Sequence, residues 1–309
     1  MSNIKIKYFN MLMKEWVSLS LKKKIFSKII SCPVCEKKKF TFLFHKINFR
    51  FVICNNCTHV FINPYLKKKI IIKHFSLSKT WDVWSNKVLQ QKKQKSVENE
   101  KYRNGVNFLK KIKKRNLSIL DIGSSSGSFI SIAIKNSWNI EGIEPSRTCY
   151  KFIKKKFNCK IYNSTFEDAK ITKQYDVITC WASFEYSINP KLFINKVIQC
   201  LKPRGKLILY ISGNSKSLVM RILREKCIGY IFNRMNYFNP ESLHLLLKKK
   251  FNKKLIKSEL DNIDIINNHL NYRDPYIKKK DLRNYKFFSK KNILKNLMGY
   301  KFLAIYEKK

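Results

Sequence analysis

The chain has 309 residues, and its 65 Lys and Arg residues against 20 Asp and Glu residues give a formal net charge of +45. Hydrophobic residues make up 44% of it, enough for one large domain and a smaller one. No run of about 18 uncharged apolar residues occurs, which argues against a membrane span, and residues 1–30 lack the uninterrupted apolar core of a signal peptide. We therefore expect a cytoplasmic protein whose nine cysteines stay reduced.

The positive charge is compatible with a nucleic-acid or anionic-lipid partner. However, lysines are spread along the whole chain, and Ile, Asn, Phe and Tyr are abundant as well, which is the composition that an AT-rich genome produces. Nucleic acid is therefore a partner that the charge allows but does not favour. The sequence gives no indication of the oligomeric state.

Two segments of the chain carry no motif, residues 1–30 and residues 66–115. Residues 1–30 are expected to form an irregular or helical arm. The arm carries the apolar side chains Trp16, Val17, Leu19 and Leu21. We expect them to pack on the body of the protein rather than to contact a membrane surface. Residues 66–115 have a helical pattern, and we expect them to link the two motif-bearing parts and to cover a cofactor.

Four cysteines form two Cys-x-x-Cys pairs, separated by 18 residues: Cys32 with Cys35, and Cys54 with Cys57. Each pair can place two thiolates on one tetrahedral ion, and the aromatic-rich residues 40–53 between them suit a hairpin. This spacing predicts a four-cysteine zinc ribbon, although a redox dithiol is an alternative. Because four thiolates leave no position for water, the Zn²⁺ would be structural.

A short apolar run, a Gly/Ser turn and a helical pattern follow one another between residues 117 and 136. They predict a buried strand over 117–122, a tight turn, and a helix over 128–136. Gly123 and Gly127 let the backbone turn sharply and approach a ligand. The free N–H groups of the helix would point into the turn, so that a cofactor could bind there.

An acidic residue, Glu144, ends the next predicted strand, 139–144, and follows Asp121 by 23 residues. An acid at that distance binds a ribose diol in doubly wound folds. The turn reads Gly-x-x-x-Gly rather than Gly-x-Gly-x-x-Gly, so a nicotinamide cofactor is disfavoured. A strand–turn–helix without any ligand is the alternative.

The rest of the chain alternates strand and helix patterns, as a parallel sheet requires. Strands are expected over 160–162, 175–181, 206–211, 254–260 and 302–306, helices over 147–157 and 190–201, and a turn over 202–205. Another helix should begin with Asn239 as its cap and Pro240 at its first position.

Five segments stand in the order and spacing of S-adenosylmethionine (SAM) dependent methyltransferases: Asp121–Gly127, Gly142–Glu144, Asp176–Thr179, Phe184–Tyr186 with Pro190, and Leu201–Gly205. With the two cysteine pairs and Phe61–Pro64 behind them, most of the chain resembles bacterial zinc-ribbon class I methyltransferases. Many of these belong to surface-polysaccharide or secondary-metabolite pathways. The resemblance implies an α/β fold, a Rossmann-like seven-stranded class I methyltransferase sheet with an N-terminal zinc ribbon. The expected domains are an arm (1–30), the ribbon (31–65), a helical linker (66–115) and a SAM-dependent methyltransferase domain (116–309).

The same resemblance assigns cofactor-binding residues. The turn carrying Asp121, Gly123, Ser125 and Gly127 would lie along the methionine part and ribose of SAM, and Glu144 would bind the ribose hydroxyls. Glu167 or Asp168 would accept from the adenine amino group, and the segment from Trp181 to Tyr186 would face the sulfonium. Ser125 replaces a family glycine, which is tolerated if its φ is negative.

A Glu-Tyr pair, Glu185-Tyr186, stands where the family has Glu-His. These two are the first candidates for catalytic residues, and Tyr237 and His244 are further candidates for a base. The expected activity is methyl transfer to a small acceptor, a sugar, sugar-nucleotide or related polysaccharide intermediate. An RNA methyltransferase and a non-catalytic SAM-binding protein are the alternatives.

Overall fold

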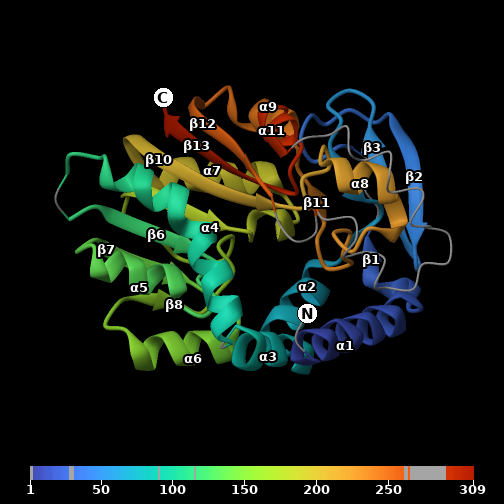
Figure 1. Cartoon of the computed structure of the whole chain (residues 1–309), viewed down its shortest axis with the longest axis horizontal. Helices are drawn as coiled ribbons and strands as arrows, with labels where there is room; N and C mark the ends of the chain where they lie inside the picture. The colour runs from blue at the N-terminus through green and yellow to red at the C-terminus, as the bar shows by residue number, and fades with distance from the viewer. Residues whose placement is uncertain (1–2, 28–30, 90, 115, 261–263, 265–289) are drawn as a thin grey trace.

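A seven-stranded sheet dominates the computed structural model, which describes residues 3–27, 31–89, 91–114, 116–260, 264 and 290–309. In spatial order the strands are β12 (Phe251–Glu259), β13 (Lys301–Lys308), β10 (Leu201–Ser212), β9 (Tyr175–Trp181), β6 (Ser118–Ile122), β7 (Asn139–Ile143) and β8 (Ile161–Tyr162) (Figure 1). Strand β13 is antiparallel to both its neighbours, and the other pairs are parallel. This is the predicted class I methyltransferase sheet.

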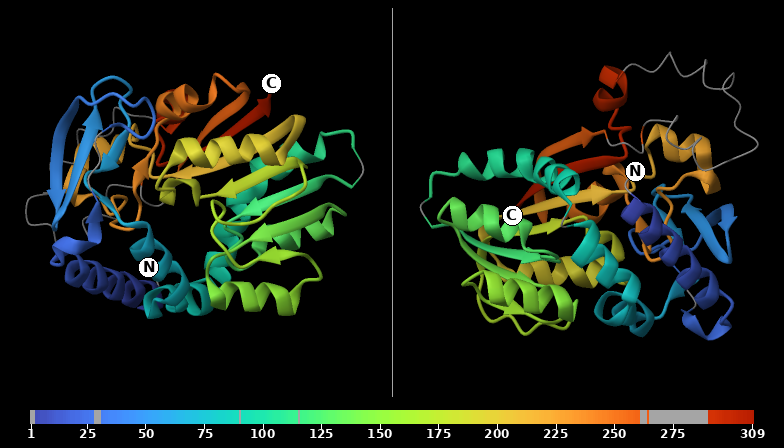
Figure 2. Two further views of the ribbon diagram at one scale, coloured as in Figure 1. Left: turned by 180° about the vertical axis from the view of Figure 1, so that it is seen from behind. Right: turned by 60° about the horizontal axis from the view of Figure 1, so that its bottom comes forward.

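Both faces of this sheet are buried, and its central strands are mostly apolar on both faces. In β10, Leu207, Leu209 and Ile211 face one core, whereas Ile208 and Tyr210 face the other. Helices α4 (Lys92–Lys110), α5 (Ser128–Lys135) and α6 (Arg147–Lys156) cover the second face. Helices α7 (Pro190–Cys200) and α9 (Pro240–Leu247) cover the first, as the view from behind shows (Figure 2).

The cysteine-rich segment forms a second, smaller sheet of β2 (Phe40–Lys46), β3 (Phe49–Cys54) and β4 (Val60–Ile62). Strands β2 and β3 pair as an antiparallel hairpin, as predicted. A fourth strand, β11 (Asn236–Tyr237), comes from the C-terminal half and pairs with β4. Strand β11 could not be predicted from the sequence, because two residues are too few to show a period. The ribbon is therefore joined to the large domain by backbone pairing.

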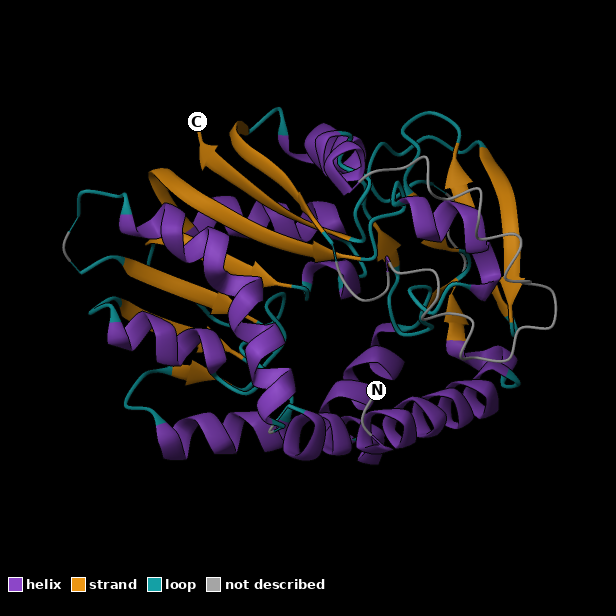
Figure 3. Ribbon diagram, viewed as in Figure 1, coloured by secondary structure: helices purple, strands orange, loops and turns teal. Residues whose placement is uncertain are grey.

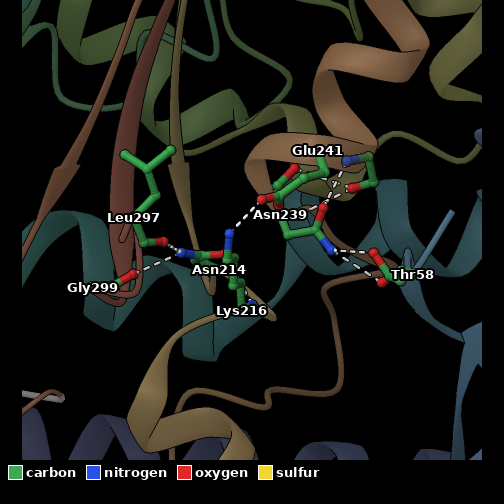
Figure 4. A network of polar contacts seen from close by, with 8 residues as sticks. Thr58, Asn214, Lys216, Asn239, Glu241, Leu297 and Gly299 are labelled. Carbon is green, nitrogen blue, oxygen red and sulfur yellow. Dashed lines mark hydrogen bonds and ion pairs between the residues drawn. The ribbon is translucent and has the colours of Figure 1, made fainter. Parts of the chain in front are cut away.

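A polar network strengthens this junction (Figure 4). Asn239, which caps α9 as predicted, donates from Nδ2 to the carbonyl and the hydroxyl of Thr58, at 3.1 and 3.0 Å. Thr58 directly follows Cys57, so the cap of α9 is tied to the second cysteine pair. Lys216 joins the same network by pairing with Glu241 of α9.

The N-terminal arm is helical, and α1 (Asn3–Ser20) packs one side on the body. The Trp16 side chain is 0% exposed and Leu19 packs on the core, whereas Val17 and Leu21 are 38% and 72% exposed. The packing prediction is thus confirmed for the first two residues and wrong for the other two. After α1 come the short elements η1 (Lys23–Ile25) and β1 (Phe26–Ser27), and β1 pairs with β5 (Tyr65–Leu66).

The predicted helical linker is divided into α2 (Lys68–Leu77), α3 (Lys79–Val83), which continues directly into η2 (Trp84–Val88), and α4. Ser78 separates the first two, because its extended backbone ends α2 and its hydroxyl accepts from Thr80 N to cap α3. Figure 3 shows α1, α2, α3 and α6 along one border of the molecule. No helix within the described residues is long and apolar enough to cross a membrane.

The predicted turn over 202–205 lies inside β10, where pairing with β9 shifts register between Leu201 and Lys206. Arg204 has a φ of 58°, so the chain does bend there, but the strand begins before the bend. The last elements are α8 (Leu218–Leu223), η4 (Arg224–Lys226) and α11 (Lys290–Lys295).

Candidate cofactor and acceptor site

The glycine turn joins β6 to α5 at the carboxyl edge of the sheet. Its Gly123 and Ser124 N–H groups both donate to the Ile143 carbonyl, at 2.8 and 3.1 Å, so the turn is held against β7. Gly123 has a φ of 77°, and a Cβ there would come within 2.7 Å of the Ser183 hydroxyl. Gly127, with a φ of 74°, begins α5. Both positions therefore require glycine.

The N-terminus of α5 is suited to binding a ligand. No side chain caps this helix, so its first N–H groups are left for a bound group. The turn also lies at β6, where the strand order reverses between β7 and β9, and ligands of doubly wound sheets bind at such a reversal.

The turn also contains Ser125, whose φ is 51°. The condition for an unstrained serine, a negative φ, is therefore not met. A side chain in the left-handed region costs about 1–2 kcal/mol. The Ser125 N–H donates to Glu144 Oε2 at 2.7 Å, and this bond helps to hold the strained conformation.

Ser125→Gly should raise the free energy of unfolding by about 1 kcal/mol, because glycine adopts this φ without strain. Chemical denaturation measures the change. Ser126→Gly is the matched control, since Ser126 is not among the residues of positive φ and its replacement should be neutral or destabilising. Equal destabilisation by both variants would show that Ser125 is not strained.

Glu144 follows β7 directly and is 3% exposed. Its Oε1 accepts from Ser146 N and its Oε2 from Ser125 N, both at 2.7 Å. Burial raises the pKa of its carboxyl to about 7, although the two N–H donors act to lower it. Each carboxylate oxygen keeps a second lone pair, so the group can still accept from the two hydroxyls of a ribose.

Asp121, at 1% exposure, links the two central strands. Its Oδ1 accepts from the Thr179 hydroxyl of β9 at 2.7 Å, and burial raises the pKa of its carboxyl to about 6. Helix α4 brings Lys101 and Tyr102 close enough to interact electrostatically with it. The sequence analysis did not single out these two residues, which carry no motif.

The two candidates for the adenine side already have protein partners. Glu167 Oε1 accepts from the Ser187 hydroxyl at 3.1 Å. Asp168, whose side chain is 50% exposed, pairs with Lys68 of α2 at 2.6 Å and accepts from the Thr165 hydroxyl. Lys68 holds the pKa of the Asp168 carboxyl below its usual value.

Trp181 ends β9 and packs beneath α4. Its ring lies 4.9 Å from that of Tyr102 and 5.0 Å from that of Phe129, and a Cβ on Gly105 would come within 2.4 Å of it. The side chain is 5% exposed, and its indole N–H has no partner among the described residues. This tryptophan thus fixes α4 against the sheet edge, and only its ring nitrogen is left for another group.

Glu185 lies in η3 (Phe184–Tyr186) and is fully buried. Its Oε1 accepts from the Ser212 N–H at 2.7 Å and from the Ser212 hydroxyl at 3.0 Å. The same hydroxyl accepts from Arg234 Nη2 at 2.9 Å. Burial raises the pKa of the Glu185 carboxyl, although the nearby Arg234 opposes this, and Oε2 has no partner in the described part of the chain.

Tyr186 joins the segment around Glu185 to α2, because its ring meets that of Phe75 edge-on at 5.0 Å. Burial raises the pKa of the Tyr186 phenol. Of the other two candidates for a base, Tyr237 lies against Arg234, whose Cζ is 5.4 Å from the centre of its ring, and His244 lies elsewhere, on α9. The Tyr237 hydroxyl is bonded to the backbone of Ile231, and His244 of α9 faces Tyr306 at 3.3 Å.

Helices α2 and α3 contact the segment that follows Glu144. The Ser76 hydroxyl donates to the Pro145 carbonyl at 3.1 Å, and the Thr148 hydroxyl donates to Asp82 at 2.8 Å. Together with the Phe75 contact, these bonds attach the segment to both halves of the sheet edge. That residues 66–115 cover a cofactor stays a prediction.

The four cysteine sulfurs form a second site. All four lie within 4.8 Å of one another, with Cys32 to Cys57 and Cys35 to Cys54 both at 3.5 Å. A tetrahedral zinc with bonds of about 2.3 Å separates its sulfurs by about 3.8 Å. The cluster therefore fits a zinc ribbon. His59 points away from it, to the Asn236 side chain at 3.2 Å.

The reversed strand order, the uncapped helix behind a glycine turn and the acid that follows β7 fit the class I methyltransferase fold. Residues 93–256, more than half of the chain, match the family model described as "Methyltransferase domain". The chain belongs to this family, whose cofactor is SAM, and is a SAM-dependent methyltransferase.

Individual relatives are distant. The ubiquinone biosynthesis O-methyltransferase of Rickettsia canadensis (strain McKiel) is 27% identical over 145 residues, which cover 42% of this chain and 60% of that protein. A Haloferax volcanii chain described as a methyltransferase, solved with the Trm112 methyltransferase activator, superposes with a TM-score of 0.52 at 13% identity. That match covers 75% of this chain and 99% of the other. A SAM-dependent methyltransferase of Thermotoga maritima gives a TM-score of 0.48 at 16% identity, covering 74% and 99%.

Proposed function

We propose that this enzyme methylates a small biosynthetic acceptor in the bacterial cytoplasm: a sugar, a sugar-nucleotide or a related cell-surface polysaccharide intermediate. The observation that carries the proposal is the buried cluster of Glu185, Ser212 and Arg234 beside Tyr186. Buried polar groups with a free carboxylate oxygen suit a small hydroxyl-bearing molecule. A polynucleotide would need an exposed basic groove, and its support is the net charge together with the cysteine cluster, since zinc modules also occur beside RNA methylation. The name of the Rickettsia relative also points to oxygen methylation of a small molecule.

The cofactor would lie against the turn at Gly123–Gly127, with Glu144 on the ribose hydroxyls and the 167–168 loop beside the adenine. When bound, it supplies a methyl group activated by the sulfonium. The chain's own task is to hold the acceptor in line with that methyl group and to exclude water. We assign the enclosing role to α2, whose Ser76 and Phe75 contact both halves of the site.

Glu185 is our candidate for the group that accepts the acceptor's proton, at Oε2. Its raised pKa makes the carboxylate a better base than an exposed glutamate. Its Oε1 is fixed by Ser212, so the free oxygen has a defined position. Tyr186 would wall the acceptor, and Arg234 would orient Glu185 through Ser212.

The four-cysteine cluster would hold one structural Zn²⁺. Its sulfurs match tetrahedral spacing, and β11 and the cap of α9 connect it to the segment that carries Arg234. The metal would thus stabilise the acceptor side without taking part in the chemistry.

Incubation with methyl-labelled SAM tests the acceptor class. The enzyme is supplied either with a bacterial small-molecule extract enriched in sugar-nucleotides or with total RNA from the same cells. We expect label in the sugar-containing fraction. Label only in RNA would overturn the proposal in favour of the RNA alternative. No label in either, from a protein that binds S-adenosylhomocysteine, would favour the non-catalytic alternative.

Glu185→Gln should lower turnover about 10²- to 10⁴-fold, because glutamine keeps an oxygen for Ser212 but cannot take a proton. Affinity for S-adenosylhomocysteine should stay within about twofold, since Glu185 is not placed on the cofactor. Turnover is measured with the labelled fraction identified above, and affinity by calorimetry. Full activity of this variant would exclude Glu185 as the base.

A further inference from the structure

Helix α1 has a solvent-facing side that its packing does not explain. The buried side carries Tyr8, Leu12 and Trp16, which fix the helix to the body. The opposite side exposes Met13 at 39%, Val17 at 38% and Leu21 at 72%. A helix with one side already packed gains nothing in stability from exposing three apolar side chains on the other.

These three residues form one stripe. Met13, Val17 and Leu21 recur every four residues, so they lie on one face of the helix and its C-terminal end. The other large hydrophobic residues with comparable exposure include single ones on separate helices, such as Ile134 of α5 and Leu192 of α7. Scattered exposed apolar residues are ordinary, whereas a stripe indicates a contact surface.

The surroundings of the stripe are cationic. Exposed lysines border it, namely Lys7, Lys14, Lys22 and Lys24. The one acidic residue between positions 3 and 24 is Glu15, which is turned to the other side and bound by His74 and Ser78, at 3.0 and 2.8 Å. The exposed side of α1 thus combines apolar side chains with exposed lysines.

We propose that the stripe, Met13, Val17 and Leu21, docks the enzyme on an anionic lipid bilayer. An apolar stripe bordered by lysines is the composition of a helix that lies in the plane of a membrane interface. Each lysine near an anionic surface adds about 1 kcal/mol of attraction, and the net charge of +45 acts in the same direction. Helix α1 lies along one border of the molecule (Figure 1), and the three stripe residues are exposed there.

Vesicle sedimentation tests the proposal with the full chain. The vesicles contain phosphatidylcholine alone, or phosphatidylcholine and phosphatidylglycerol in equal parts. The wild type should sediment with the anionic vesicles and much less with the neutral ones. The triple variant Met13→Gln, Val17→Gln, Leu21→Gln keeps every charge and uses a good helix former, and it should bind the anionic vesicles roughly tenfold or more weakly.

The matched control replaces three exposed apolar residues elsewhere, Ile134→Gln, Leu192→Gln and Leu294→Gln, and should bind like the wild type. If the triple variant unfolds, the single change Leu21→Gln, outside the helix, repeats the test. If the wild type and the triple variant bound the anionic vesicles equally, charge attraction alone would explain binding and the proposal would be overturned. It would also be overturned if the control variant lost as much vesicle binding as the triple variant. A stripe that is required for binding a single-stranded RNA oligonucleotide, but not vesicles, would overturn it in favour of nucleic acid.

Discussion

Cys54→Ser is expected to leave the purified protein without zinc and to unfold its ribbon. The variant removes one of four thiolates whose sulfurs are already grouped within 4.8 Å. In small zinc modules the binding free energy, about 10–16 kcal/mol, is largely folding free energy. The three short strands of the ribbon cannot replace that with their own core. Metal analysis should give about one zinc per wild-type chain and none in the variant.

The loss should reach beyond the ribbon, because β4 pairs with β11 and Thr58 binds the cap of α9. We therefore expect a lower Tm for the whole chain. Cys159→Ser is the control, since Cys159 is a partly exposed thiol outside the cluster and its replacement should leave zinc and Tm unchanged. A wild-type protein that is metal-free and fully folded would refute the zinc assignment.

The sequence predicted those parts of the fold that local patterns define. The apolar run at 117–122, the glycines behind it and Glu144 at the end of β7 are short-range signals, and the structure brings them to one sheet edge. The cysteine cluster and its hairpin could be predicted for the same reason, because two Cys-x-x-Cys pairs joined by a hairpin form a ribbon without distant contacts.

Contacts between distant segments could not be predicted. Arg234 reaches Ser212 only because Gly213 has no side chain, since a Cβ there would come within 2.1 Å of its Nη1. The contact of Phe75 with Tyr186 joins residues that no motif connects. The positive φ of Ser125 could not be predicted either, because its N–H is held by the tertiary bond to Glu144.

Glu144→Gln should weaken S-adenosylhomocysteine binding about 10- to 150-fold, because hydrogen bonds to a charged group contribute about 1.5–3 kcal/mol. Glutamine keeps the size of the side chain and one acceptor oxygen for Ser125 or Ser146. Glu144→Ala should lose at least as much, since the turn also loses its anchor. Calorimetry measures both. Glu141→Gln is the matched control, because Glu141 lies on the same strand but binds Tyr175 and Lys173, away from the cofactor edge.

The same carboxyl should make binding depend on pH. Its pKa of about 7 means that the charged form, which ribose hydroxyls prefer, fills as pH rises from about 6 to 8, so wild-type affinity should rise over that range. Stability should move the other way. The pKa of Glu144 in the folded protein lies above its ordinary value of 4.5. The contribution of Glu144 to the free energy of unfolding is therefore complete below pH 4.5 and is lost as the pH rises toward 7. Both trends should be weaker in Glu144→Gln. An unchanged dissociation constant would make Glu144 only an anchor for the turn, and preference for a nicotinamide dinucleotide would contradict the cofactor itself.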